Sequence, residues 1–413
     1  MRHHGGSARA CLLGLLLAAG GSAASASETA FYPALQTRMA LYDNRRMRPD
    51  DSLIDLASIT DARVGIVHST PEYTVSLVPQ GRISRYVRQG ELDADDVFVD
   101  VGATRRFERD ELNGQFRFER QTTLTTELTD SGVLDTNLYR TQLGGRGSWR
   151  HNWTERLVST VSGGVIDNSY EELPGSAFID FRTSDAALGL QYAVSPQTTW
   201  LLDLGVNRFD TPALDSCTVS YTYQFGIQHV FDQTLDATFR VGQNISRRTT
   251  RFSQPRLVSL FPLRFETIRG TDKEHGAGRL VNVLVSRHFE RADLDIYWDR
   301  YFSPSNQGGR QQRQTVGAEF EWDMRERWTA TWDFEYRVQD RESDFVTGVD
   351  ALDVYETGAT LAWQFTREIS LEATYRFRLQ VSAAVPSTAS SNELVLALRY
   401  GGRAFDWPFE WPR

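Results

Sequence analysis

The chain has 413 residues and is acidic, with 45 Lys plus Arg against 54 Asp plus Glu and a net charge of −9. This acidity argues against a nucleic-acid-binding protein, which would carry a basic surface. A soluble chain of this length would divide into two or three domains, yet no linker rich in Pro, Gly or Ser interrupts the sequence. We therefore expect a single structural unit with no nucleic-acid partner.

The N-terminus has the layout of a secretory signal peptide. Basic residues between Arg2 and Arg9 precede an apolar run from Ala10 to Ala19, and small residues follow up to Ala26. The apolar run is about half as long as the roughly 20 residues that a membrane-spanning helix needs. We expect residues 1–26 to be removed on export, which leaves Cys217 as the only cysteine and rules out an internal disulfide.

Apolar and polar residues alternate in stretches of about ten residues over most of the chain. Successive side chains of a strand point to opposite faces, so each stretch has one apolar face and one polar face. Such stretches exceed the usual soluble strand of about five or six residues and suit a tilted strand that crosses a bilayer. In chain order the clearest predicted strands are Trp200–Asn207, Leu235–Asn244, Val316–Trp322, Trp328–Gln339, Tyr355–Phe365, Ile369–Gln380 and Leu394–Tyr400.

Eight short turns alternate with nine longer polar connections between these stretches. The first short turn is 70–72, and the longest connection is 247–278. Aromatic residues recur at strand ends, as an interfacial girdle would require. This regular alternation of turn and loop is typical of outer-membrane β-barrels and not of soluble β-sandwiches. The girdle candidates are Trp149, Trp328, Trp363, Phe365 and Tyr400.

Seventeen connections join eighteen strands, or sixteen if a weak strand such as Ala34–Tyr42 is misassigned. Because lipid offers no partner for backbone polar groups, the sheet has to close. The predicted fold class is therefore all-β, a transmembrane antiparallel β-barrel of about 18 strands over residues 27–400 with both termini periplasmic. Residues 401–413 form a periplasmic tail that could cover the mouth, since their prolines exclude a central strand. We expect the protein in the outer membrane of a Gram-negative bacterium, around an aqueous lumen.

The longest connection, Arg247 to Gly278, combines several arginines with an apolar core at Leu257–Leu263. Connections of this length are unusual and often functional. Three interpretations remain open. The first in rank is a loop folded into the lumen as a constriction; the others are an external ligand-binding loop and a simple surface extension.

If the apolar residues of each strand face lipid, the intervening charges face the lumen. We hypothesise that they form two opposed walls whose transverse field selects solutes by charge. The alternative is that they are solvated charges paired with cross-strand neighbours. The predicted basic wall is Arg82, Arg106, Arg117, Arg140, Arg146 and Arg150, and the predicted acidic wall is Asp295, Asp299, Glu319, Glu321, Asp333, Glu335, Glu356 and Glu372.

Catalytic and metal-binding motifs are not found. The chain has no G-x-S-x-G elbow and no H-E-x-x-H pair, and its histidines are scattered. Ser286 and His288 share a face of one strand, but no third partner can be identified from the sequence. We expect no enzyme activity, no catalytic residues, no metal site and no cofactor.

Two short stretches have the form of known motifs. The stretch from Arg120 to Gly132, which contains Thr-Leu-Thr-Thr-Glu-Leu, is similar to a T-L-T-x-E-L-x-x-x-G motif, and Leu41-Tyr42-Asp43-Asn44 is similar to a Y-D-D-N motif without the second Asp. With these motifs the chain resembles a family of predicted outer-membrane β-barrel porins that are often encoded beside exopolysaccharide and exosortase genes. The resemblance implies a barrel linked to polysaccharide export or surface assembly, and it supplies no catalytic residues.

The sequence thus predicts an outer-membrane channel that passes hydrophilic solutes or supports polysaccharide export. A structural barrel of a surface-polysaccharide assembly system, without an open pore, is the alternative. Expected partners are outer-membrane lipid, the barrel insertion machinery, and polysaccharide or small hydrophilic solutes. The oligomeric state, the solute and any protein partner are left open.

Overall fold

The computed structural model describes residues 27–49, 53–126, 137–171, 178–260, 263–304, 310–342, 350–382 and 387–401. The predicted signal 1–26 and nearly all of the predicted tail lie outside these ranges. The strands are β1 Glu28–Tyr42, β2 Asp55–Ser69, β3 Tyr73–Tyr86, β4 Ala94–Arg106, β5 Asp110–Thr122, β6 Tyr139–Asn152, β7 Leu157–Tyr170, β8 Phe181–Ser195, β9 Thr198–Thr211, β10 Ser216–Asp232, β11 Leu235–Leu260, β12 Leu263–His288, β13 Ala292–Pro304, β14 Arg310–Arg325, β15 Trp328–Glu342, β16 Asp350–Gln364, β17 Ile369–Ser382 and β18 Ser387–Tyr400.

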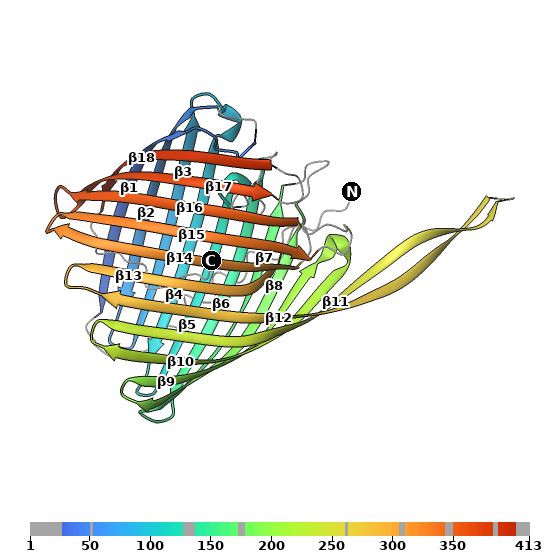
Figure 1. The fold of residues 1–413 in the computed structure, drawn as a ribbon, viewed down its shortest axis with the longest axis horizontal. Coiled ribbons are helices and arrows are strands. Elements are labelled where there is room, and N and C mark those ends of the chain that lie inside the picture. The colour runs from blue at the N-terminus through green and yellow to red at the C-terminus, as the bar shows by residue number, and fades with distance from the viewer. Residues whose placement is uncertain are drawn as a thin grey trace.

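All eighteen strands form one antiparallel sheet in which each strand pairs with its neighbours in the chain (Figure 1). The sheet closes because β1 also pairs with β18, from Leu35 opposite Tyr400 to Tyr42 opposite Glu393. Closure satisfies the backbone groups that an open edge would leave unpaired in lipid. The prediction of a closed barrel with eighteen strands is confirmed, and the sixteen-strand alternative is wrong.

Short turns gather at one end of the barrel, where β1 begins and β18 ends. The connections there are compact, as between β2 and β3, where the Thr70 amide donates to the Tyr73 carbonyl at 2.8 Å. By the usual orientation of outer-membrane barrels this is the periplasmic end. At the opposite, extracellular end lie three short helical turns, η1 Gly90–Leu92, η2 Pro212–Leu214 and α1 Thr123–Thr126.

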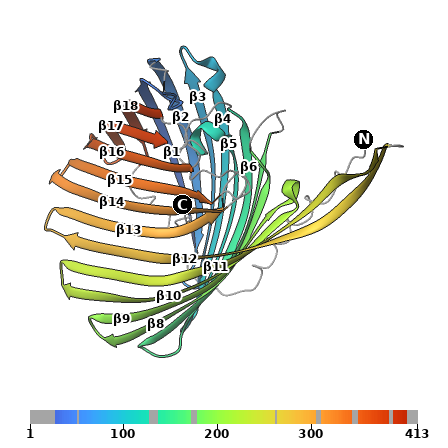
Figure 2. The ribbon, with the colours of Figure 1, turned by 45° about the vertical axis from the view of Figure 1, so that its right-hand side comes forward.

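The longest predicted loop is instead a strand pair. β11 and β12 remain in register from Leu235 opposite Arg287 to Leu260 opposite Leu263, with one irregularity near Ser259. β12 pairs with β13 only up to Val281, so the rest of the hairpin leaves the barrel wall and projects beyond its extracellular rim (Figures 1 and 2). The expected constriction at Arg247–Gly278 is therefore wrong. The two strands continue their mutual pairing past the point where the barrel ends.

The seam between the first and last strands is reinforced at its extracellular end. Asp43 accepts hydrogen bonds from the Asn392 amide at 2.6 Å and from Asn392 Nδ2 at 2.5 Å, and the Asp43 amide donates to the Asn392 carbonyl at 3.2 Å. Asn44 Nδ2 donates to the Ser390 carbonyl at 3.1 Å and to the Arg48 carbonyl at 2.7 Å. The connection after β1 is thereby fastened to β18.

Removing this fastening should weaken the barrel. In the Asp43→Ala variant, two donors of Asn392 lose their charged acceptor, and we expect a loss of about 1–3 kcal/mol in the free energy of unfolding. Urea unfolding of the refolded barrel in detergent measures this loss. The control is the Asp353→Ala variant, because Asp353 is another carboxylate at the extracellular end. An equal loss of stability in both variants would contradict the role of the seam.

Candidate functional site

The two faces of the sheet differ in the way that a membrane barrel requires. Large apolar residues with exposed side chains share the outer face, for example Phe225 at 54% and Leu204 at 41% relative exposure. Polar residues such as Gln142 and Asn168 are buried on the inner face. Near the periplasmic end, the outer face carries stacked Trp328 and Trp363, whose ring centroids lie 5.6 Å apart. These aromatics lie where an interfacial girdle is expected.

The closed sheet, the apolar exterior and the polar interior define the class of protein. The chain is an outer-membrane β-barrel whose outer face contacts lipid and whose inner face lines a lumen. Within the described ranges, no helix is long and apolar enough to cross a membrane.

The six arginines of the predicted basic wall all point into the lumen, on β3 to β6. Five of them form ion pairs with carboxylates one or two strands away, and Arg150 lies opposite Glu111 in register. Cross-strand neighbours therefore offset much of the positive charge on this side. The pairs are Arg82–Asp61 at 2.6 Å, Arg106–Glu111 at 3.3 Å, Arg117–Asp100 at 2.5 Å, Arg140–Glu119 at 3.8 Å and Arg146–Asp185 at 2.9 Å.

The predicted acidic residues lie on the inner face of β13 to β17. Asp295, Glu319 and Asp333 are directly opposite one another on three consecutive strands, β13, β14 and β15. Glu335 and Glu356 are likewise opposite one another on β15 and β16. Like charges in directly opposed positions destabilise a sheet. A wall selected for stability alone would alternate the two signs, as β4, β5 and β6 do.

A recess of about 920 Å³ opens along this acidic wall. Its lining includes eight carboxylates and four arginines, so it is strongly negative overall. Seven of the eight predicted acidic residues line it: Asp295, Asp299, Glu319, Glu321, Asp333, Glu335 and Glu356. Asp293, which was not predicted for this wall, is the eighth, and Glu372 lies outside the recess and pairs with Arg399 at 3.4 Å.

Three of the four arginines of this recess form ion pairs with only two of its carboxylates. Arg376 and Arg378 contact Glu356 at 3.1 and 2.7 Å, and Arg337 contacts Glu335. In the described part of the chain, no ion pair reaches the central row of Asp295, Glu319 and Asp333. This row therefore presents to the lumen three carboxylates that form no ion pair, although the charge of Arg376 acts on Asp333.

Two glycines make room for the side chains of the acidic wall. A Cβ at Gly358 would lie 2.6 Å from Asp333 Oδ1, and a Cβ at Gly317 would lie 2.3 Å from the Tyr297 ring. Both glycines therefore let a neighbouring side chain lie close to the backbone. Tyr297 in turn reaches Glu335 Oε2 with its hydroxyl at 3.4 Å.

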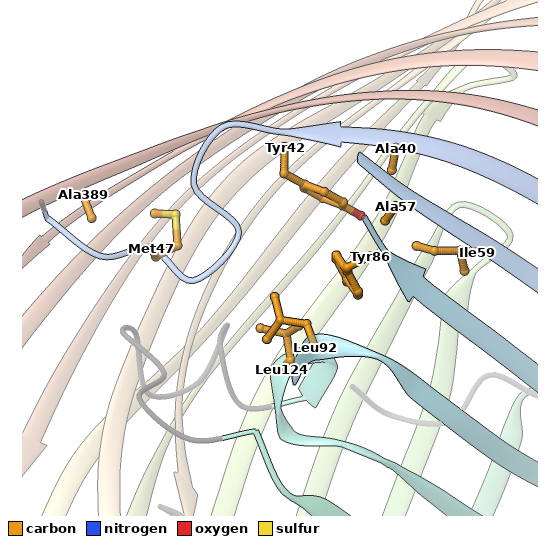
Figure 3. Packing of buried hydrophobic residues seen from close by; sticks show 9 residues of the cluster. All are labelled: Ala40, Tyr42, Met47, Ala57, Ile59, Tyr86, Leu92, Leu124 and Ala389. Atoms are coloured by element: carbon orange, nitrogen blue, oxygen red, sulfur yellow. The ribbon is translucent and has the colours of Figure 1, made fainter. Parts of the chain in front are cut away.

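A second feature of the lumen is an apolar cluster near the extracellular end (Figure 3). Inward residues of the first strands, among them Tyr42 and Tyr86, form its base. Met47, Leu92 and Leu124, from three separate connections, pack onto this base and are 1 to 2% exposed. The connections after β1, β3 and β5 thus fold inward against the wall. These segments, rather than Arg247–Gly278, narrow the extracellular part of the lumen.

Buried polar groups hold the connections after β3 and β5 in place. Asp55 is 2% exposed and accepts hydrogen bonds from the amides of Arg88 and Gln89 at 2.9 and 3.0 Å. Thr123 is fully buried, and its hydroxyl accepts the Leu138 amide at 3.0 Å. Each bond satisfies a backbone donor that the inward fold removes from water.

The described parts of both stretches that resemble the porin family belong to this cluster and its surroundings, and residues 127–132 of the second stretch lie outside the described ranges. Tyr42, Asp43 and Asn44 provide the base of the cluster and the fastening of the seam, and Thr123 and Leu124 provide its cover. The two stretches lie more than seventy positions apart in the chain. Their proximity follows from the inward course of the connections after β1 and β5, which no local pattern indicates.

The weak catalytic candidate has no relay geometry. His288 Nδ1 lies 2.6 Å from Asp293 Oδ1, a partner that the sequence did not reveal. The other ring nitrogen, Nε2, faces Asp236 at 3.8 Å rather than the Ser286 hydroxyl. Among the described residues, no group of three or more His, Cys, Asp or Glu side chains is arranged to hold a metal ion.

No protein-family model matches the chain, and no curated protein matches it. Solved structures with similar folds include the outer membrane protein OpdK from Pseudomonas aeruginosa, at 11% identity and a TM-score of 0.45 over 90% of this chain and 99% of that one. Acinetobacter baumannii OccAB3 has 11% identity and a TM-score of 0.46 over 90% and 98%. The ferric-catecholate import receptor Fiu from E. coli K12 has 9% identity and 0.46 over 89% and 81%. Likeness at this level indicates neither a family nor a function.

Proposed function

We propose that the protein is an outer-membrane channel that passes small hydrophilic solutes and favours cations over anions. The observation that carries this proposal is the unpaired acidic row of Asp295, Glu319 and Asp333 on the wall of the lumen. A ring or wall of carboxylates raises the local concentration of cations and lowers that of anions. The other wall, where arginines and carboxylates pair, contributes less net charge.

An 18-stranded barrel is wide enough to keep an aqueous lumen after its own side chains are placed. The inward connections at the extracellular end reduce this width on the side of β1 to β3, whereas the acidic recess lies on β13 to β17, centred about five strands away around the closed sheet. The proposed route therefore runs along the acidic wall. The lipid of the outer membrane surrounds the barrel, and the barrel insertion machinery is the partner proposed for its assembly.

A second candidate function is a structural barrel of a surface-polysaccharide assembly system, without an open pore. It is favoured by the apolar cluster, because three connections packed inside the lumen would suit a closed barrel. The channel proposal has a related version, in which the channel supports polysaccharide export and the polymer itself is a partner. The structural barrel and the export channel both rest on the family resemblance and on the position of the two stretches that carry it.

Swelling of liposomes in isotonic solutions of sugars of increasing size separates the two functions. If the protein is a channel, vesicles that contain the refolded barrel swell in small sugars, and the rate falls as the sugar grows. No swelling above that of protein-free vesicles, from a barrel shown to be folded by its circular dichroism, would support the structural function. Swelling in the longest oligosaccharides would support polysaccharide export.

A further inference from the structure

The outer face of the barrel carries a group of basic residues at one depth and on one side. Arg208 on β9, Arg247 on β11, Arg279 on β12 and Arg300 on β13 point outward. Each arginine is the next outward residue, toward the extracellular end, after an apolar outward residue of the same strand. The apolar residues are Val206 on β9, Ile245 on β11, Val281 on β12 and Trp298 on β13. The four arginines, which we call the basic belt, therefore mark the extracellular border of the lipid-facing band.

The strand register places members of the belt side by side. Val219 on β10 lies directly between Arg208 and Arg247, and Arg247 lies opposite His275 on β12. Lys273, the only lysine of the chain, follows opposite Thr249 and is exposed. Positive groups thus continue from the belt onto the base of the projecting hairpin.

Most of these charges have no carboxylate partner. Arg208 pairs with Asp210 at 2.7 Å. Within the described chain, no ion pair is formed by Arg247, Arg279, Arg300 or Lys273. On the other side of the barrel, the described outward positions at the extracellular ends of β16, β17, β18 and β1 carry no basic side chain. Outward arginines also lie at the extracellular ends of β3, β5 and β8, but Arg85 and Arg182 pair with Asp95 and Asp167, and Arg120 lies over the ring of Tyr139. The outward arginines that have neither kind of partner are therefore concentrated on β11–β13, in a chain whose net charge is −9.

We infer that the basic belt binds the phosphate groups of a phosphorylated glycolipid in the outer leaflet of the membrane. The belt lies directly above side chains that face acyl chains, which is the depth at which the headgroup of such a lipid begins. Arginine is suited to phosphate because its planar guanidinium donates two parallel hydrogen bonds. Basic residues at the border of an anionic leaflet attract its headgroups. A bound lipid would hold the base of the β11–β12 hairpin at the membrane surface, and this inference does not depend on the proposed channel function.

Binding of diphosphorylated lipid A to the refolded barrel in neutral detergent tests the inference. The R247Q/R279Q/R300Q variant removes the three unpaired arginines. The control R105Q/R287Q/R325Q removes the same number of arginines near the periplasmic end. A basic residue near an anionic surface contributes roughly a fivefold gain in affinity, so the belt variant should bind about a hundredfold more weakly and the control should match the wild type.

Two further measurements identify the ligand. Lipid A without phosphates should bind the wild-type protein weakly, with the affinity that diphosphorylated lipid A has for the belt variant. Millimolar inorganic phosphate should not displace lipid A from the wild-type protein, because free phosphate lacks the acyl chains. Equal binding by the belt variant and the wild type, equal loss in the control, or displacement by free phosphate would each overturn the inference. Should the triple variant fail to refold, R247Q against R105Q gives the same comparison with an expected fivefold effect.

Discussion

Neutralising the acidic row should reduce the cation preference of the channel by about tenfold. In the D295N/E319Q/D333N variant the side chains keep nearly the same shape but lose three charges that face the lumen. A unit charge at about seven ångströms from a permeating ion contributes roughly 0.6 kcal/mol in water at low ionic strength. Three charges then contribute about 1.8 kcal/mol, roughly a twentyfold change, and screening by salt reduces it to about a tenfold change in relative permeability. The reversal potential across a gradient of potassium chloride measures this ratio. The effect should shrink as the salt concentration rises.

The matched control removes three carboxylates from the outer face. Asp95, Asp167 and Asp353 belong to β4, β7 and β16 and share the outward positions of these strands. The D95N/D167N/D353N variant has the same net charge as the lumen variant, and its reversal potential should equal that of the wild type. If the two variants shift the reversal potential equally, overall charge rather than the acidic wall determines selectivity.

Truncating the cover of the apolar cluster should widen the extracellular part of the lumen. Leu92 and Leu124 are buried against the inward base at Tyr42 and Tyr86. Leucine to alanine changes at buried positions cost about 2–5 kcal/mol each, which is large compared with the few interactions that fasten each connection. In the L92A/L124A variant we expect the connections to leave the wall, with a higher and noisier single-channel conductance.

Two leucines of the lipid face provide the control for this truncation. Leu204 and Leu361 are about 40% exposed on the outer face, so the same change there leaves the lumen untouched. The L204A/L361A variant should conduct like the wild type. An unchanged conductance of L92A/L124A, with normal folding, would mean that the inward connections do not limit the flow of ions.

Much of the architecture could be predicted because the membrane imposes a period of two on each strand. Trp328–Gln339 alternates without interruption, and the observed β15 covers the same segment and extends three residues further. The short turns were recognisable because charged and turn-forming residues break the alternation, as at Thr366-Arg367-Glu368 between β16 and β17. Counting such breaks was enough to predict eighteen strands.

The dependence of this period on the membrane also explains why Arg247–Gly278 was predicted to be a loop rather than a strand pair. Beyond the bilayer both faces of a strand meet water, so apolar and polar residues no longer alternate even though the backbone still pairs. The segment from Arg247 to Leu260 has arginines in both kinds of position, at 247 and 251 and at 248 and 256. Periodicity alone could not distinguish a paired ribbon from a loop here.

For the candidate site, alternation predicted which charges face the lumen but not how they pair. Asp61 contacts both Arg38 and Arg82, which lie on the strands to either side of it, and this depends on the register between three strands. The apolar cluster depends on contacts among Met47, Leu92 and Leu124, each in a connection without a repeating pattern. Long-range packing of this kind has no local sequence signal.

The central claim is that the acidic wall belongs to an open, cation-selective lumen. Planar-bilayer recording of the refolded exported chain, with the reversal potential taken in a gradient of potassium chloride, tests it most directly. The structure predicts steady conductance steps and a reversal potential whose sign shows that cations permeate more readily than anions. Absence of conductance from a folded barrel, or a reversal potential that indicates anion flow, would contradict it.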